Sequence, residues 1–429
     1  MTAVLSSKRN ILFEKRFNRC ALCILDATLS DYAWLVVFNL LLFESTLQEI
    51  FPLLSAVDEI STILLAFAAL FAIAKAPVIG ALRPLCASVI MVGIGLLGNL
   101  LFGMQHSLQA ILIDIFTCIK YPIAALAGFA VLRKRKSMLN LVLLECKALL
   151  LVMAVCAVLN LFSDIGMGSE IRYGIRSFSF VFSHYTFLSV GLVGILLLLC
   201  QNPFKNRIWI AIALVLMCST LRSKAFGFVA IFLFLLISQR GKSSPYLLLT
   251  LGIGAAIAIS WDQIVFYYTS DGFARNELTR AAFEVAGDYA PFGTGFATFG
   301  SNVTGEPEFY SPLYFEYGLS NVYGLTPNDA SFVSDTFWPT VLGQFGYAGL
   351  LVYGALLVSL FQFQRNGLSK ITAASLYIYL FISSTSESAF FNPSAVFLAF
   401  CAGLAAAGVS SMTEANQIHS NQLIEESGL

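Results

Sequence analysis

The chain has 429 residues, with 25 basic and 25 acidic side chains and therefore no net charge. Apolar residues make up 58% of the chain and charged residues only 12%, and the mean hydropathy is +0.80. These values exclude an ordinary soluble globular domain and predict an all-α polytopic integral membrane protein. Three histidines in the whole chain also argue against a metal site, and none is predicted.

Apolar segments recur along the chain at lengths suited to membrane helices, because about 20 mostly apolar residues cross the hydrocarbon core. The expected architecture is about 12 transmembrane helices with one large extracytoplasmic loop that contains short helices. Nine helices are expected in residues 1–261, the loop in 262–335, and three helices with a tail in 336–429. The expected spans are residues 32–51, 59–76, 85–103, 108–132, 139–162, 180–200, 207–221, 224–238, 245–261, 336–361, 371–386 and 391–409.

The basic residues predict the orientation of these spans, because lysine and arginine in short loops stay on the cytoplasmic side. Under the twelve-span arrangement, 17 of the 25 basic residues fall on one side and six on the other. Both termini are therefore expected in the cytoplasm, and the large loop outside. The run Arg133–Lys136 is interpreted as a cytoplasmic stop signal and not as a nucleic-acid patch, so no nucleic-acid partner is expected.

Charged residues within spans form a second informative class, because each one costs about 2.5 to 3.5 kcal/mol near the bilayer centre on insertion scales. Such residues pair with one another or serve a function. We expect interhelical ion pairs from four residues: Asp114, Lys120, Glu145 and Lys147. The acidic residues Glu44, Asp58 and Glu59 fall near the expected outer interface, where solvation is the simplest expectation.

Cations on the outer face are few, and they predict an anion site. Arg222 and Lys224 fall in a tight outer turn between two spans, where a buried guanidinium needs an anion. Arginine binds phosphate through two parallel donors and stays charged at any accessible pH. We therefore predict that a lipid-linked phosphate or diphosphate binds among these cations, with neutralisation of the loop carboxylates as the alternative. The candidate residues are Arg172, Arg176, Arg222, Lys224, Arg275 and Arg280.

The expected loop, residues 262–335, contains ten carboxylates, two arginines and sixteen aromatic residues. A loop of this length is uncommon unless it is functional or disordered, and the aromatic content argues against disorder. Asn276 is expected to cap a short amphipathic helix over residues 277–286, which ends at Gly287. The glycine-rich stretch of residues 291–300 that follows allows tight turns and close backbone approach to a ligand.

Aromatic side chains follow the glycine-rich stretch, and Tyr314 is the candidate among them for substrate binding. Their broad apolar faces and polar tips suit stacking on sugar rings. They suit equally well a loop that packs a small core of its own, and the sequence leaves both alternatives open.

At its end the loop resembles a known family, the bacterial O-antigen ligase and polysaccharide polymerase superfamily. The resemblance lies at Arg280, at Pro291–Phe299, at Asp335 and at Gly346-Tyr-Ala-Gly349, and upstream at Arg222-Ser-Lys224. It covers most of the chain in layout but only the loop and its flanks in motif. Ligase members have His-Asn where this sequence has Asp335-Thr336, so the resemblance favours the polymerase branch.

The resemblance implies an enzyme of the bacterial inner membrane that transfers sugars without a cofactor. The donor would be a growing glycan on undecaprenyl diphosphate, and the acceptor a hydroxyl of another lipid-linked repeat unit in surface polysaccharide biosynthesis, such as O-antigen, capsule or exopolysaccharide. Arg222 and Arg280, helped by Arg176, would bind the diphosphate, and Asp335 would orient or deprotonate the acceptor. Asp335 also suits a helix cap at residue 336, and the two roles are compatible.

Other functions compete with this interpretation. An O-antigen ligase would use the same donor with a lipid A core as acceptor. A transporter or flippase of polysaccharide precursors also has about twelve spans, but the sequence shows no pair of related halves. The resemblance further implies membrane lipid, a chain-length regulator and a flippase as partners.

Overall fold

The computed structural model describes residues 27–75, 80–168, 170–238, 245–270 and 272–409, and most of them are helical. Within these residues, five helical segments are long and apolar enough to cross a membrane, and a sixth is added if one bent pair is counted as a single span. The five are Pro52–Ala74, Leu82–Phe102, Leu108–Leu132, Lys136–Phe162 and Trp338–Arg365. A helical membrane protein is therefore confirmed. The two chain ends lie outside the described residues, and the N-terminal one carries five of the orienting cations.

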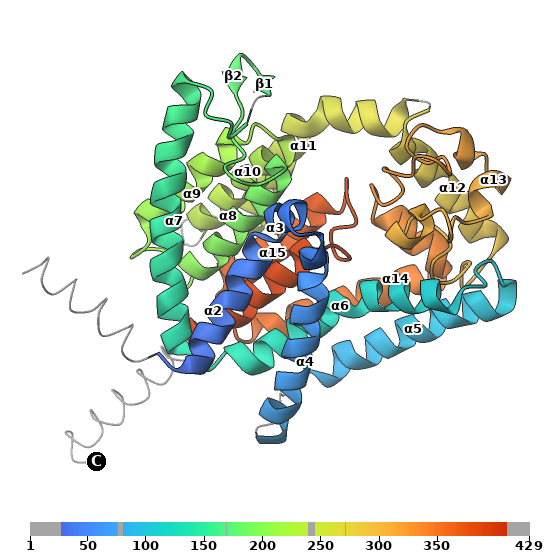
Figure 1. Cartoon of the computed structure of the whole chain (residues 1–429), viewed down its shortest axis with the longest axis horizontal. Coiled ribbons are helices and arrows are strands. Elements are labelled where there is room, and N and C mark those ends of the chain that lie inside the picture. Colours follow the sequence, from blue (N-terminus) through green and yellow to red (C-terminus); the bar gives the residue numbers. More distant parts are fainter. Residues whose placement is uncertain (1–26, 76–79, 169, 239–244, 271, 410–429) are drawn as a thin grey trace, which may run out of the picture.

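The helices follow the expected order along the chain (Figure 1). The longer ones are α4 (Val57–Lys75), α5 (Leu82–Phe102), α6 (Leu108–Leu132), α7 (Lys136–Phe162), α11 (Pro245–Thr269) and α14 (Trp338–Arg365). The shorter apolar ones are α8 (Tyr185–Leu199), α9 (Arg207–Ser219), α10 (Ser223–Ser238), α15 (Lys370–Ser383) and a last helix, Pro393–Val409. α2 (Leu29–Leu42) and α3 (Glu44–Ile50) meet at a bend of 76°.

Four pairs of helices form the main contacts of the bundle: α10 with α11, α5 with α14, α4 with α6, and α12 (Ala274–Asp288) with α14. α11 runs across the top of Figure 1 from α10 to α12 and so joins the two sides of the molecule. It continues to Thr269, beyond the predicted end at residue 261, and the loop therefore begins later than predicted.

Buried charges hold the early helices together. Lys120 on α6 pairs with Asp58 on α4 at 2.6 Å, and both side chains are almost fully buried. This confirms an interhelical ion pair for Lys120. The expectation of a solvated Glu44 and Asp58 was wrong, because Glu44 is only 5% exposed and Asp58 is fully buried.

Asp114, the other charged residue of α6, forms no ion pair among the described residues and instead anchors the loop. Its carboxylate accepts hydrogen bonds from Ala297 N at 2.7 Å, Ser301 Oγ at 2.5 Å and Gln344 Nε2 at 2.9 Å. On α5, Asn99 pairs through its amide with both backbone groups of Phe296, at 2.8 and 2.9 Å. The glycine-rich stretch is thus inserted among three helices and buried from residue 293 to 300.

The glycines of this stretch allow contact between backbones. A Cβ on Gly293 would lie 2.4 Å from Gly346 N, and one on Gly295 would lie 2.4 Å from Asn99 N. Gly346 itself has φ 60° and interrupts α14, while the N–H groups of Thr294 and Gly295 bond the carbonyls of residues 343 and 344. The prediction that these glycines let the backbone approach a ligand is corrected, because their lack of a side chain serves close packing against α5 and α14 instead.

The rest of the loop builds a small core of its own. Leu278, Ala281, Ala282 and Val285 are buried on one face of α12, as the amphipathic pattern predicts. α12 begins at Ala274, earlier than predicted, and has no side-chain cap, because Asn276 lies inside it and bonds the carbonyl of residue 270. The core also includes residues of α13 (Leu313–Glu316) and of the 3-10 helix η3 (Leu319–Asn321), whereas Val303 of the 3-10 helix η2 (Asn302–Gly305) packs with Ala110 of α6 and Ala297.

Candidate functional site

A small β-hairpin contributes the first cations of the site. β1 (Ile171–Arg172) pairs antiparallel with β2 (Ile175–Arg176), and the two residues between them both have positive φ, which the tight turn requires. Glu170 precedes the hairpin and accepts from Arg172 Nε at 2.7 Å through one oxygen. Its other oxygen accepts from Arg222 Nη2 at 2.6 Å, so one carboxylate holds two guanidinium groups together.

Arg222 lies in the tight break between α9 and α10, where Leu221 has φ 52°. Its guanidinium lies over the ring of Tyr185, 4.4 Å from the centroid. Its Nε is buried and has no hydrogen-bond partner. The side chain is therefore fixed by Glu170 and Tyr185 while one charged donor stays unused.

Lys224 and His184 join this group to a second one. Lys224 pairs with Glu387, in the turn after α15, at 3.2 Å. His184 caps α8 by accepting a hydrogen bond from Thr186 N, and the charges of Arg222 and Lys224 act on its imidazole. Burial and these two cations lower its pKa, so the imidazole is neutral at pH 7.

The second group is centred on Arg275 and Asp335. Arg275, in the first turn of α12, donates from Nη2 to Asp335 Oδ2 at 3.0 Å and to the carbonyl of Ser386 at 3.3 Å. Its guanidinium lies 4.6 Å from the ring centroid of Tyr267 at the end of α11. Its Nε, like that of Arg222, is buried and has no partner.

Asp335 has the environment that a proton acceptor needs. Burial raises its pKa above the ordinary value, while Arg275 and then Lys224 oppose this increase. The capping alternative is corrected, because α14 begins at Trp338 rather than residue 336 and no side chain bonds its first turn. The carboxylate is therefore free of a capping role and faces Arg275.

These residues form one charge cluster, in which each group acts electrostatically on the next. Its members are Arg172, Arg222, Lys224 and Arg275, the carboxylates of Glu170, Glu387 and Asp335, and the neutral His184. Four cations against three carboxylates leave one positive charge in excess. Side-chain exposure of the seven charged members ranges from 19% for Arg275 to 39% for Glu170, so the cluster is shielded but reachable.

Three residues that the sequence proposed for the site lie elsewhere. Arg280 is 71% exposed on α12 and pairs only with Glu284, one turn along the same helix. Arg176 pairs with Asp164, at the start of the segment that leads to the hairpin. The assignment of Tyr314 to sugar stacking is corrected, because its ring is fully buried and its hydroxyl accepts from Gly300 N at 2.9 Å.

Two other residues in or beside the cluster were not predicted as site residues. Glu387 lies in the serine-rich turn of residues 383–388, which was assigned to a span and its edge. A carboxylate in so polar a segment between two apolar helices was the available signal. Tyr267 was not predicted because the helix that became α11 was expected to end at residue 261. Among the described residues, no group of three or more His, Cys, Asp or Glu is placed to hold a metal ion.

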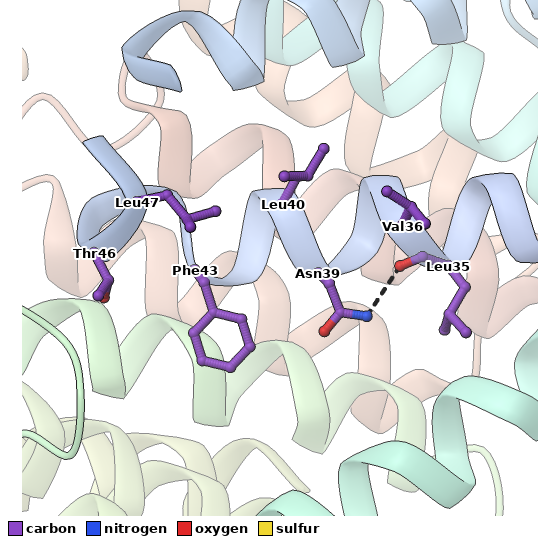
Figure 2. Close-up of a pocket in the computed structure, with 7 residues that line it drawn as sticks. All are labelled: Leu35, Val36, Asn39, Leu40, Phe43, Thr46 and Leu47. Atoms are coloured by element: carbon purple, nitrogen blue, oxygen red, sulfur yellow. Dashed lines mark hydrogen bonds between the residues drawn. The ribbon is translucent and has the colours of Figure 1, made fainter. Parts of the chain in front are cut away.

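One hollow follows the bent pair α2 and α3 and contains no residue of the charge cluster. It has a volume of about 510 Å³, and apolar side chains line it together with Asn39 and Thr46 (Figure 2). The only hydrogen bond drawn among its lining residues joins Asn39 to the carbonyl of Leu35 within α2. Because none of the charged residues lines it, the cluster and not this hollow is the better candidate for chemistry.

Comparisons with known proteins returned no match: no family model, no curated protein and no solved structure is similar to this chain.

Proposed function

We propose that the protein is a polymerase of lipid-linked oligosaccharide repeat units, as the resemblance of its loop motifs implies. The observation that carries the proposal is the pair Arg222 and Arg275. Each guanidinium lies over an aromatic ring, each is held by a carboxylate, and each keeps a buried Nε without a partner. Arginines that are held in place and keep an unused hydrogen-bond donor, in a cluster with excess positive charge, suit a diphosphate, whose oxygens accept several charged hydrogen bonds.

In this proposal Arg222, Arg172 and Lys224 bind the undecaprenyl diphosphate of the donor. As the bond between the sugar and the diphosphate breaks, negative charge grows on the leaving oxygen, and fixed cations stabilise it. Glu170 keeps Arg172 and Arg222 in place before the substrate binds. Arg275 replaces Arg280 as the arginine that the loop contributes, because only Arg275 reaches the cluster.

Asp335 accepts the proton of the acceptor hydroxyl as the oxygen of that hydroxyl bonds the donor sugar. Its raised pKa brings the carboxylate closer to the basicity that proton transfer at neutral pH requires. Arg275 holds the carboxylate in its charged form and orients it. The proton therefore moves from the acceptor to Asp335, and the diphosphate leaves with the electron pair of the broken bond.

The proposal includes the finer topology. The short apolar helices α8, α9, α10, α15 and Pro393–Val409 would cross the membrane together with the longer ones, giving twelve spans with both ends in the cytoplasm. Their lengths, from 13 to 17 residues, fall short of the about 20 residues that cross the hydrocarbon core, so each would cross it together with flanking residues. The charge cluster would then lie at the outer surface of a bacterial inner membrane, where lipid-linked repeats are polymerised.

Two alternatives compete. An O-antigen ligase would use the same cluster and differ in its acceptor. A flippase of lipid-linked sugars is favoured by one observation, the bend of 76° between α2 and α3 beside the buried charges of α4 and α6, because transporters bind ions at interrupted helices.

The decisive experiment is a reconstituted assay with purified protein and lipid-linked oligosaccharide, in which products are separated by length. Polymerase activity gives a ladder, whereas a flippase relocates its substrate without lengthening it. Arg222→Ala is expected to lower the rate about 100- to 1000-fold, the typical effect of removing one donor that stabilises developing charge. Arg280→Ala is the matched control and keeps the wild-type ladder. An Arg222→Ala protein as active as the wild type would overturn the proposal.

A further inference from the structure

Three carboxyl groups and one lysine meet at the bend between α2 and α3. Glu44 is the first residue of α3, Asp58 and Glu59 lie in the first turn of α4, and Lys120 reaches them from α6. Glu44, Asp58 and Lys120 are 5%, 0% and 4% exposed. We call Glu44, Asp58 and Glu59 the acidic trio.

The trio contains buried oxygen atoms that have no hydrogen-bond donor if all three groups are ionised. Glu44 Oε2, Asp58 Oδ1 and Glu59 Oε2 are each buried and without a hydrogen-bond partner. The side chains of Glu44 and Glu59 both interact with the Asp58 carboxyl. Ionised carboxylates only accept hydrogen bonds, so such contacts become favourable when one carboxyl is protonated and donates a hydrogen bond to the other.

The distribution of positive charge indicates which carboxyl carries the proton. Lys120 Nζ lies 2.6 Å from Asp58 and 3.6 Å from Glu59, so its single positive charge is nearest to those two groups. Glu44 has no ion pair among the described residues, and its Oε1 accepts a hydrogen bond from Asp58 N at 3.3 Å. A negative charge on Glu44 would add to an acidic excess that Lys120 does not compensate, which is costly at membrane depth.

We infer that the acidic trio is a proton-binding site in which Glu44 is protonated at neutral pH and donates a hydrogen bond to ionised Asp58. The charged groups facing Glu44 are Asp58 and Glu59 from α4, with Lys120 behind them on α6. Uptake of the proton breaks no other bond and changes the charge at the bend by one. Because Glu44 begins α3, release of that proton would leave an unpaired carboxylate at the bend between the two helices.

Infrared spectroscopy of the full chain in lipid nanodiscs tests this inference, since the carbonyl stretch of a protonated carboxylic acid is separate from that of a carboxylate. Spectra are compared for the wild type, Glu44→Gln and the matched control Glu49→Gln, an exposed carboxylate of the same helix. At neutral pH we expect a protonated-acid band that is lost in Glu44→Gln and kept in Glu49→Gln. Gln also imitates the neutral acid, so the variant is expected to fold.

A Glu44→Gln spectrum identical to that of the wild type at neutral pH would overturn the inference. If this variant fails to assemble, glutamate-specific ¹³C labelling of the wild type decides instead. A protonated-acid band that shifts on labelling supports a protonated glutamate, and the absence of any shifted band overturns the site. Neither result depends on polymerase activity, so this experiment tests the inference independently of the proposed function.

Discussion

Removal of the Asp114 carboxylate is the most direct test of how the loop is anchored. Asp114 is 1% exposed and accepts from a loop N–H, a loop hydroxyl and the amide of Gln344. The variant Asp114→Ala deletes the acceptor of all three donors at once. The matched variant Ser301→Ala deletes only one of the three.

The magnitude follows from the donors left behind. Each buried donor without a partner costs about 1 to 3 kcal/mol, so three would cost about 3 to 9 kcal/mol if nothing relaxed. Deleting a buried carboxylate with no ion pair among the described residues also returns part of its own desolvation cost, which is several kcal/mol. The two effects oppose each other, and we expect Asp114→Ala to lower the free energy of unfolding by about 3 kcal/mol. Ser301→Ala should lower it by about 1 kcal/mol.

Unfolding in mixed detergent micelles measures these free energies, and limited trypsin digestion reports on the loop itself. Cleavage after Arg280 should become faster in Asp114→Ala, because α12 packs against a loop that has lost its anchor. If Asp114→Ala unfolds and is cleaved like the wild type, residues 293–300 are not held among α5, α6 and α14 as described, and the reasoning is refuted.

Three further predictions concern the site and the break in α14. Arg275→Ala should reduce polymer formation as strongly as loss of Arg222, about 100-fold or more, whereas Arg280→Ala leaves the product ladder unchanged in the reconstituted assay. The rate should rise with pH as Asp335 loses its proton. Arg275→Gln should move this acid limb to higher pH, because Arg275 lowers the pKa of Asp335, which burial raises. An acid limb at the same pH in the variant's pH–rate profile would exclude Asp335 as the base. Gly346→Ala should lower the free energy of unfolding by about 2 kcal/mol or more, since its φ is 60° and a Cβ would lie against Pro291 O, while Gly354→Ala, with open space around its Cβ, should be neutral or stabilising by up to about 1 kcal/mol.

Sequence reasoning works best where one physical rule dominates. The apolar segments that became α4 to α7 and α14 stand out because membrane depth sets their length and composition. The buried face of α12 follows from the same periodicity. The bend after α2 and the break at Gly346 could not be predicted in the same way, because both depend on partners far away in sequence. The carbonyls of residues 343 and 344, just before the break at Gly346, accept hydrogen bonds from the N–H groups of Thr294 and Gly295. No local sequence pattern reveals these partners.

The site was predicted in kind but not in detail. Arg222 and Asp335 were chosen for their residue types and positions, and the structure brings both into one cluster. Arg275 and Arg280 look alike in sequence, but only the rotation of α12 decides which of them faces Asp335. The difference of five residues along a helix places the two side chains on different faces. Tyr314 illustrates the same limit, because a loop aromatic can serve a core as well as a surface.

The junction of the loop with the bundle bears on how this loop can be exchanged for a loop of another protein. A loop exchange that treats residues 270–337 as a cassette would leave Asn99, Asp114 and Gln344 without their native partners. It would also place a foreign segment against the open turn of α14. Chimeras meant to transfer specificity should therefore carry the matching residues of α5, α6 and α14 together with the loop.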